Sequence, residues 1–480
     1  MLRKPFIKGS IMKPIYSFTA ALALSGAAMA ETPPTLISGA AQRQSMAITV
    51  YNDDLALVKE QRKIKLPAGA SWLSLREVSA RMRPETALLR AASGAPITLV
   101  EQNFDFDLLT PAKLLEKYVG REVTVLRVHP STGAETAEKA TVLATNGGTV
   151  LRFANRIETG APGRIVFDSV PPNLRDRPTL SVLLEATGGE QALELSYLTG
   201  GLSWKSDYVS NLSADGKHMN LSGWVTLTNN SGSAYTDATL QLVAGNVNRV
   251  RPDLPAMAYM AAPAPRAKAA APVAEESLMD YHLYSFDRPT SVAESQTKQL
   301  ALLSASDIAV KREYVLAGSE YYYRERYGDL GQKLKPQVFI SFDNKGSQLG
   351  KPLPGGVVRV YAKDSKGAAQ FVGEDRIAHT AKNETIRLKL GEAFDISADR
   401  KQTSFKKLAD NLVETAYRVD LRNAKDEAVT VRVVESMPGD WDIVQESIKG
   451  SKESARANVW QVEVPAGGSA MLAYTARVKW

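Results

Sequence analysis

The stretch from Tyr197 to Val250 constrains the fold more than any other part of the chain, because its β-type runs are separated by turn residues at close intervals. From Leu221 to Thr228, apolar residues and glycine alternate with polar residues and a tryptophan. This period of two is typical of a strand with unlike faces. Asn229 to Gly232 then predicts a turn, because Asn and Gly tolerate positive φ. We therefore expect a mostly β protein with a β-sandwich as its C-terminal domain.

The first thirty residues have the features of a secretory signal peptide. Basic residues precede a short apolar run that is rich in small residues and ends in Ala28-Met29-Ala30. We expect cleavage between Ala30 and Glu31, and hence an exported protein that is periplasmic or peripherally associated with the cell envelope. A membrane anchor would need about 20 apolar residues, and no run in the chain is that long. We expect no transmembrane helix in the mature chain.

The composition narrows the possible classes of protein. The chain has no cysteine, which excludes disulfides and a thiol nucleophile. Its formal net charge is +7, of which the first thirty residues supply four positive charges and no acid, so the mature chain stands near +3 (7 − 4). So small an excess of positive charge does not favour a nucleic-acid partner.

The N-terminal part of the mature chain, residues 31–104, is predicted to be a small β unit. Short runs from Ala47 to Val50 and from Ala56 to Lys59 predict two strands around a turn, and Pro67 to Gly69 predicts a second turn.

Residues 105–172 combine one well-signalled helix with a small β unit. Thr110 is placed to cap the helix, Pro111 suits its first position and Gly120 suits the residue after its end. Four short strand-like runs with turn signals between them follow, so we expect a small barrel-like unit of the SH3 type.

Residues 173–480 form the predicted β-sandwich domain, interrupted by a linker rich in alanine and proline at 251–276. Three predicted strands end on an asparagine that is followed by a short polar turn and another strand, namely Asn229, Asn344 and Asn423. This pattern indicates a weak internal repeat. The alternative is that asparagine simply makes good turns.

Several segments in a fixed order resemble a known family. They are LSYLTGGLSWKSDYV, GWVTLTNNSG, LQLVAGNVNRV, KPLPGGVVRVY with GEDRIAHT, and RNAKDEAVTVRVVESMPGDWDIV. Together they resemble the uncharacterised family of exported bacterial proteins, with a domain of unknown function, that includes the mucoidy-inhibitor A group. The resemblance covers nearly all of the mature chain. It implies a β-sandwich domain and an exported location, and it supplies no reaction and no catalytic residues.

The sequence carries no local catalytic signature. The four histidines are scattered, and zinc-protease, P-loop, GxSxG and GxGxxG patterns are absent. We expect no cofactor and no metal. Glycoside hydrolysis needs only two acids about 5 to 9.5 Å apart, which any two strands can supply. The weak candidates for such a catalytic pair are Asp105 with Asp107, Glu374 with Asp375 and Asp440 with Asp442. The alternative is that they are solvated turn acids or ends of ion pairs.

Aromatic residues are the better candidates for binding. If the segment EYYYRERY is a strand, then Tyr321, Tyr323 and Tyr327 share one face, which suits stacking on sugar rings or on a protein partner. The alternative is a strand whose tyrosines are half buried in the sandwich. The tryptophans that we expect to pack in the core or at its edge are Trp204, Trp224 and Trp441.

These observations predict an exported cell-envelope protein of unknown activity. We expect binding or scaffolding without catalysis, with an envelope polysaccharide or another envelope protein as the partner. The alternative is a carboxylate-dependent hydrolase that acts on envelope glycan or peptide.

Overall fold

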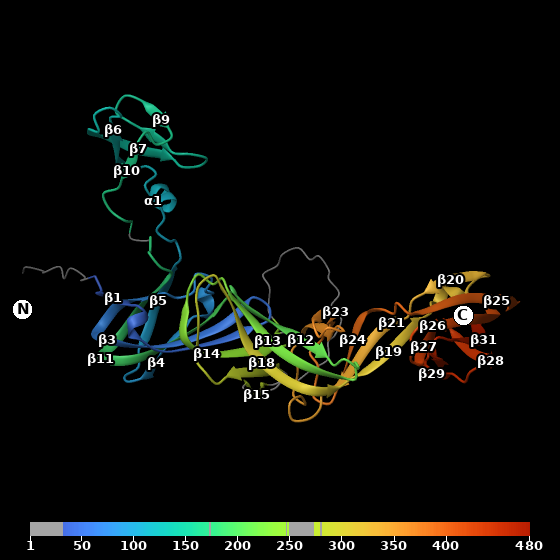
Figure 1. Ribbon diagram of the computed structural model, residues 1–480. Helices are drawn as coiled ribbons and strands as arrows, with labels where there is room; N and C mark the ends of the chain where they lie inside the picture. The colour runs from blue at the N-terminus through green and yellow to red at the C-terminus, as the bar shows by residue number, and fades with distance from the viewer. Residues whose placement is uncertain (1–31, 172–173, 246, 249–272, 279–280) are drawn as a thin grey trace, which may run out of the picture.

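The computed structural model describes residues 32–171, 174–245, 247–248, 273–278 and 281–480. The predicted cleavage point between Ala30 and Glu31 and most of the predicted linker lie outside these residues. Strands dominate the described residues, among which a single α-helix occurs, so the mostly β fold is confirmed. Figure 1 shows a long body of strands, with a small unit projecting from it near its N-terminal end.

The first sheet contains ten strands in the order β15-β16-β14-β2-β3-β11-β4, with β1 paired to β3, β17 to β14 and β5 to β11. The 3-10 helices η1 (Ala40–Gln42) and η2 (Pro84–Thr86) lie between its strands. The strands are β1 (Thr35–Ser38), β2 (Arg43–Tyr51), β3 (Leu55–Arg76), β4 (Leu88–Ser93), β5 (Thr98–Asp105), β11 (Thr179–Thr199), β14 (Tyr235–Ala244), β15 (Val273–Leu278), β16 (Tyr281–Phe286) and β17 (Thr290–Val292).

Two predictions fail in this sheet. Residues 273–276, expected in the linker, belong to β15, whose backbone pairs with β16. The turn expected at Pro67 to Gly69 is absent, because β3 continues through it beside β11. Proline has no N–H for the ladder, and the opposite strand accommodates it with Gly188, which the pairing leaves out. Positive φ at Gly69 (90°) and Gly188 (90°) bends both strands without ending them.

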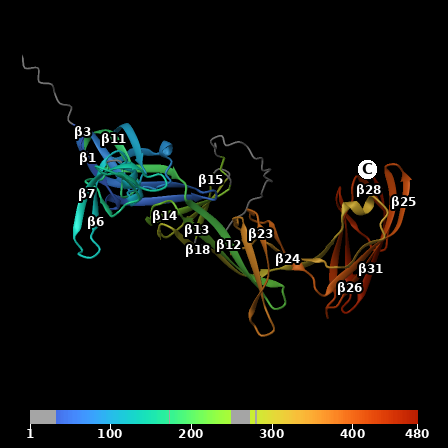
Figure 2. The same ribbon diagram turned by 90° about the horizontal axis from the view of Figure 1, so that it is seen from above.

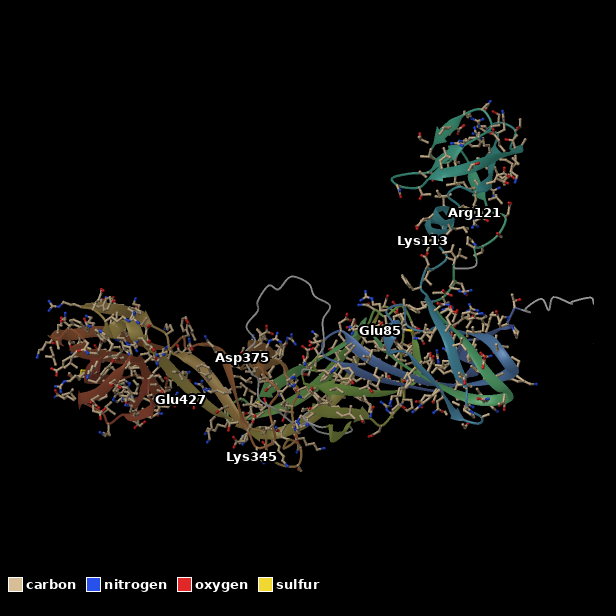
Figure 3. The ribbon with its side chains drawn as sticks, turned by 180° about the vertical axis from the view of Figure 1, so that it is seen from behind. Glu85, Lys113, Arg121, Lys345, Asp375 and Glu427 are labelled. Atoms are coloured by element: carbon tan, nitrogen blue, oxygen red, sulfur yellow. The ribbon has the colours of Figure 1, made fainter. Side chains whose placement is uncertain are left out.

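The projecting unit consists of α1 and a five-stranded sheet. The helix α1 (Pro111–Lys117) begins as predicted, because the Thr110 side chain accepts a hydrogen bond of 3.1 Å from the Lys113 N–H. Figure 3 places Lys113 and Arg121 in this unit. Tyr118 of the helix end packs with the strands in a separate small core. The strands, in the order β10-β6-β7-β8-β9, are β6 (Glu122–Val128), β7 (Glu135–Ala144), β8 (Val150–Arg152), β9 (Ile157–Thr159) and β10 (Arg164–Val166).

The rest of the chain forms three further sheets. The middle sheet, in the order β18-β13-β12-β22-β23, contains β12 (Leu202–Leu212), β13 (His218–Asn229), β18 (Gln296–Ala309), β22 (Gly356–Lys363) and β23 (Ala369–Ile377). The next sheet, in the order β24-β21-β19-β27-β30-β29, contains β19 (Lys311–Ala317), β21 (Gln337–Asp343), β24 (Thr385–Glu392), β27 (Val429–Ser436), β29 (Ser451–Ser454) and β30 (Ala457–Val464). The last sheet, in the order β20-β25-β26-β31-β28, contains β20 (Asp329–Leu334), β25 (Ile396–Ala409), β26 (Leu412–Asn423), β28 (Asp440–Glu446) and β31 (Ser469–Lys479).

Three hydrophobic cores hold these sheets. The largest core joins the first sheet to the middle sheet, the second fills the C-terminal sandwich and the third lies in the projecting unit. Strand β21 links two of them, because Ile340 and Phe342 belong to the largest core whereas Val338 packs against the C-terminal one. Figure 2 shows the middle sheet between the first sheet and the C-terminal strands. The two large cores are therefore connected through a strand that contributes to both, and not only through a loop.

The three asparagines of the predicted repeat occupy equivalent places. Asn229, Asn344 and Asn423 are all buried at the end of a strand. Each donates hydrogen bonds from its side-chain nitrogen to at least two backbone carbonyls and accepts one from a backbone N–H two to six residues later. Each asparagine therefore acts as a side-chain bracket, whose hydrogen bonds tie a turn to a neighbouring segment. This role goes beyond the turn-forming tendency of asparagine.

Candidate functional site

The middle sheet turns one face to the largest core and the other to solvent. On β13, Leu221, Val225 and Leu227 are buried in the core, and Ser222, Trp224 and Thr226 point the other way. Because side chains alternate along every strand, the outward positions of five neighbouring strands form one continuous surface. We call this surface the outer face. Its main side chains are Lys205, Asp207, Trp224, Thr226, Gln299, Arg359, Tyr361, Phe371 and Glu374.

The outer face is assembled from segments that lie far apart in the sequence. Strands β12 and β22 pair in parallel, and β22 then pairs with β23, which places Arg359 opposite Glu374. On the other side of β12, β13 places Trp224 opposite Asp207. The segments SWKSDYV, GWVTLTNNSG, VVRVY and GEDRIAHT, on which the family resemblance partly rests, therefore meet in one sheet.

A row of hydrogen bonds and ion pairs crosses all five strands of the outer face. Gln299 Nε2 donates to Thr226 Oγ1 (3.4 Å), and Thr226 Oγ1 donates to Asp207 Oδ2 (3.3 Å). Arg359 Nη1 donates to Asp207 Oδ1 (3.1 Å), and Arg359 Nε lies 3.2 Å from Glu374 Oε2. We call these five residues the polar strip. Its members hold one another in place, so the strip is preorganised rather than a set of loose surface side chains.

The charges of the polar strip are closely balanced. Its hydrogen bond to Asp207 raises the pKa of Arg359 above the usual arginine value, with burial opposing this, so the guanidinium stays charged. Lys205 Nζ lies 3.6 Å from Asp207 Oδ2 and adds one positive charge at the edge. The strip thus offers charged donors and acceptors without a strong field of either sign. Such a surface suits an uncharged, hydroxyl-rich ligand better than a polyanion.

Aromatic rings lie beside the polar strip, Trp224 opposite Asp207 and Phe371 on the same strand as Glu374. Trp224 is 40 % exposed, and its neighbour across the strand pair on β18 is the small Ala301. Phe371 is 55 % exposed and meets Tyr361 edge to face, with ring centroids 5.7 Å apart. Exposed rings of this kind offer flat apolar area next to hydrogen-bonding groups.

The exposure of Trp224 corrects an expectation. Trp204 and Trp441 are buried as expected, whereas Trp224 faces solvent from the outward register of β13. The signal was in the sequence, because Trp224 alternates with the core residues Leu221, Val225 and Leu227 and falls between them.

The two acids Glu374 and Asp375 do not face each other as a catalytic pair would. Glu374 belongs to the polar strip, whereas Asp375 accepts hydrogen bonds of 2.8 Å from the backbone N–H groups of Arg376 and Lys389. Adjacent residues of a strand point to opposite sides. Figure 3 shows Asp375 in the middle of the long body.

Asp440 and Asp442 lie on one side of β28, as the spacing of two predicts. Both are exposed, and Trp441 between them is buried and donates from Nε1 to the Ala455 carbonyl (2.8 Å). The positions opposite them on β31 are Lys479 and Arg477. The pair is therefore accessible, and its catalytic role stays a prediction.

The tyrosine segment differs from the expected strand. Glu320–Tyr323 forms the 3-10 helix η3, so Tyr321 and Tyr323 do not share a face. Tyr323 is completely buried, whereas Tyr321 is 49 % exposed and meets Tyr327 edge to face at 5.6 Å. The segment folds this way because the Tyr322 carbonyl accepts hydrogen bonds from inside the sandwich, including one of 2.7 Å from the Tyr417 hydroxyl. Binding through Tyr321 and Tyr327 stays a prediction.

Beneath this segment lies a buried ion pair that the sequence did not reveal. Arg400 Nη2 and Glu435 Oε1 are 2.8 Å apart, with both side chains at most 1 % exposed. The Tyr323 hydroxyl donates to Glu435 Oε2 (3.4 Å). Burial raises the pKa of Glu435 above the usual glutamate value, and the attraction of Arg400 opposes this only in part. The pair comes from different sheets, so no local spacing in the sequence signals it.

No group of three or more His, Asp or Glu side chains in the described ranges is arranged to hold a metal ion. Likewise, no helix in them is long and apolar enough to cross a membrane.

Comparison with known proteins concerns mainly the C-terminal three fifths of the chain. The model of a family described as a domain of unknown function, DUF4139, matches residues 193–480. This range contains every strand of the middle sheet and of the C-terminal sandwich, and hence the whole outer face. None of the curated proteins compared with the chain matches it. The grouping with the mucoidy-inhibitor A proteins stays a prediction.

Proposed function

We propose that this chain, which belongs to the family with the DUF4139 domain of unknown function, is an exported, non-catalytic glycan-binding protein of the cell envelope. The observation that carries the proposal is the outer face, where exposed rings flank a preorganised polar strip. Sugar rings present apolar C–H faces that stack on aromatic side chains, and their hydroxyls hydrogen-bond to charged groups. Export rests on the signal-like first thirty residues, and a periplasmic or peripheral envelope location is part of the proposal.

The geometry of the outer face favours an extended polymer over a small molecule. Trp224 on β13 and Phe371 on β23 are three strand spacings apart across the sheet, or about 14 Å. Because they stand level with Asp207 and Asn211 of β12, they are also four residues apart along it, or about 13 Å. The surface between them is the solvent-facing side of the sheet, so a bound chain would contact a ring at each of its two ends and the polar strip between them. Each contact is modest, and the affinity would come from engaging several contacts at once.

Co-sedimentation tests this proposal. Purified mature protein is mixed with isolated peptidoglycan, lipopolysaccharide or exopolysaccharide, and the bound fraction is compared with that of Trp224→Ala/Phe371→Ala. We expect the wild-type protein to sediment with at least one polymer and the double variant to bind at least tenfold more weakly, since each lost stacking contact costs about 1 kcal/mol.

Two controls make the experiment decisive. Trp480→Ala/Phe394→Ala removes one tryptophan and one phenylalanine ring that are at least as exposed, at 47 % and 88 %, but lie elsewhere. It should bind like the wild type. Binding lost through Tyr321→Ala instead would move the site to the tyrosine segment. Absence of sedimentation with all three polymers would refute the glycan proposal and leave an envelope protein as the partner.

The same samples address the hydrolase alternative. Sugar released by the wild-type protein but not by Asp440→Ala/Asp442→Ala would overturn the non-catalytic part of the proposal. Both aspartates are exposed, so the double variant should keep its fold.

A further inference from the structure

A groove of about 570 Å³ lies on the first sheet, outside the family domain. It opens on the sheet face turned away from the largest core, because Trp72 alternates with the core residues Leu73 and Leu75. The side chains used below, Trp72, Asn103, Asp105, Arg175 and Ser181, all line it. Asp105 is the last residue of β5, and Arg175 lies in the segment that leads from the projecting unit back to β11. Figure 1 shows the projecting unit joined to the body beside β5.

The polar end of the groove is built around one carboxylate. Arg175 donates to Asp105 Oδ2 from both Nε (2.9 Å) and Nη2 (2.8 Å), and Ser181 Oγ donates to the same oxygen (3.2 Å). Among the described residues, Asp105 Oδ1 and Arg175 Nη1 have no hydrogen-bond partner. The groove therefore holds a fixed acceptor and a fixed donor side by side, both available to a ligand.

We propose that this groove is a second carbohydrate site, which takes a single neutral pyranose ring. Two adjacent hydroxyls of the sugar would meet the free acceptor of Asp105 and the free donor of Arg175, while the C–H face of the ring stacks on Trp72. The carboxylate disfavours an anionic ligand, because a like charge beside it costs energy. None of these residues belongs to the outer face, so the groove and the outer-face proposal stand or fall separately.

Fluorine NMR of the full mature protein labelled with 5-fluorotryptophan tests the groove directly. The chain has six tryptophans, and Trp72→Phe and Trp224→Phe identify the two resonances of interest by their loss. Glucose, galactose, mannose and N-acetylglucosamine are titrated separately to roughly 100 mM, because single-ring sites bind in the millimolar range. Ethylene glycol at the same concentration supplies adjacent hydroxyls without a ring and controls for them.

We expect a saturable shift of the Trp72 resonance with at least one sugar and none with ethylene glycol. Asp105→Asn and, independently, Asn103→Ala should weaken the binding, the former by at least tenfold. Asn103 takes no part in the contacts between Asp105, Arg175 and Ser181, so its variant guards against simple loosening of the connecting segments. No Trp72 shift with any sugar, or a shift that Asp105→Asn leaves unchanged, would overturn the proposal.

The readouts separate this inference from the outer-face proposal. A shift of the Trp72 resonance without polymer sedimentation would support the groove and refute the outer face. Sedimentation that depends on Trp224, with a silent Trp72 resonance, would do the reverse.

Discussion

Replacing Asn423 by alanine should weaken the C-terminal sandwich by an amount that follows from its contacts. The Asn423 side-chain nitrogen donates to the carbonyls of Glu427 (2.8 Å), Pro465 (3.0 Å) and Val464 (3.3 Å), and its oxygen accepts from the Lys425 N–H (3.0 Å). The side chain is 2 % exposed. The alanine variant therefore removes two donor hydrogens and one acceptor where water has little access.

Each net hydrogen bond contributes about 1 kcal/mol, and a buried group left without a partner costs somewhat more. The expected loss is about 3 kcal/mol in the free energy of opening of β26 and β30, the two strands that Asn423 ties together. Since 1.36 kcal/mol corresponds to a factor of ten, amide protons in these strands should exchange roughly a hundredfold faster. Hydrogen exchange followed by mass spectrometry measures this for peptides from each strand.

Two comparisons locate the effect. Asn411→Ala changes an exposed asparagine just before β26 and should alter the opening free energy by less than about 0.5 kcal/mol. Peptides from β13, which belongs to the other large core, should keep their exchange rates in the Asn423 variant. Unchanged exchange in β26, or equal acceleration in β13, would refute the bracket role of Asn423.

The remaining predictions concern the buried ion pair. Gly318→Ala should reduce the free energy of unfolding of the C-terminal sandwich by about 1–3 kcal/mol, and so lower its melting temperature, because the added Cβ would meet the buried Glu435 carboxylate. Gly328→Ala is the control and should be nearly neutral, because nothing lies within 4 Å of its Cβ. Equal melting temperatures would contradict the packing. Because burial raises the pKa of Glu435, the folded state binds that proton more tightly than the unfolded chain, so stability should fall as pH rises from about 4.3 through the raised value. Thermal unfolding across that range should show this slope in the wild type and lose it in Glu435→Gln.

Much of the fold could be predicted because it depends on neighbours in the sequence. The alternation of Leu221, Val225 and Leu227 predicted β13, and the cap at Thr110 predicted the start of α1. The failures at Pro67 and in the tyrosine segment have a common cause. In both places the backbone conformation is set by contacts with residues distant in sequence. At Pro67 the contact is the pairing with β11, and at η3 it is the hydrogen bonding to the interior of the C-terminal sandwich.

The candidate site was less predictable for the same reason. The sequence indicated Glu374 as a possible catalytic acid. Its place in the polar strip depends on Arg359 and Asp207, which come together only through the parallel pairing of β12 with β22. The alternation of residues predicts that Trp224 points outward. No local pattern predicts that the residue opposite it on β18 is the small Ala301, which leaves the ring exposed to solvent. Local periodicity predicts which face of the sheet a side chain lies on, whereas the strand order determines which side chains are its neighbours.

The two proposed sites lie on sheets that pack against one another, and this limits how they can act together. The first sheet and the middle sheet share the largest core, and each site lies on the face turned away from it. A single sugar ring therefore cannot contact both Trp72 and Trp224. Two segments of a long polymer, or two separate polymers, can engage the sites at once, and the fixed separation would then raise the effective concentration for the second contact. A protein built in this way would bridge strands of an envelope glycan, which gives the scaffolding role a physical basis that one flat surface alone does not provide.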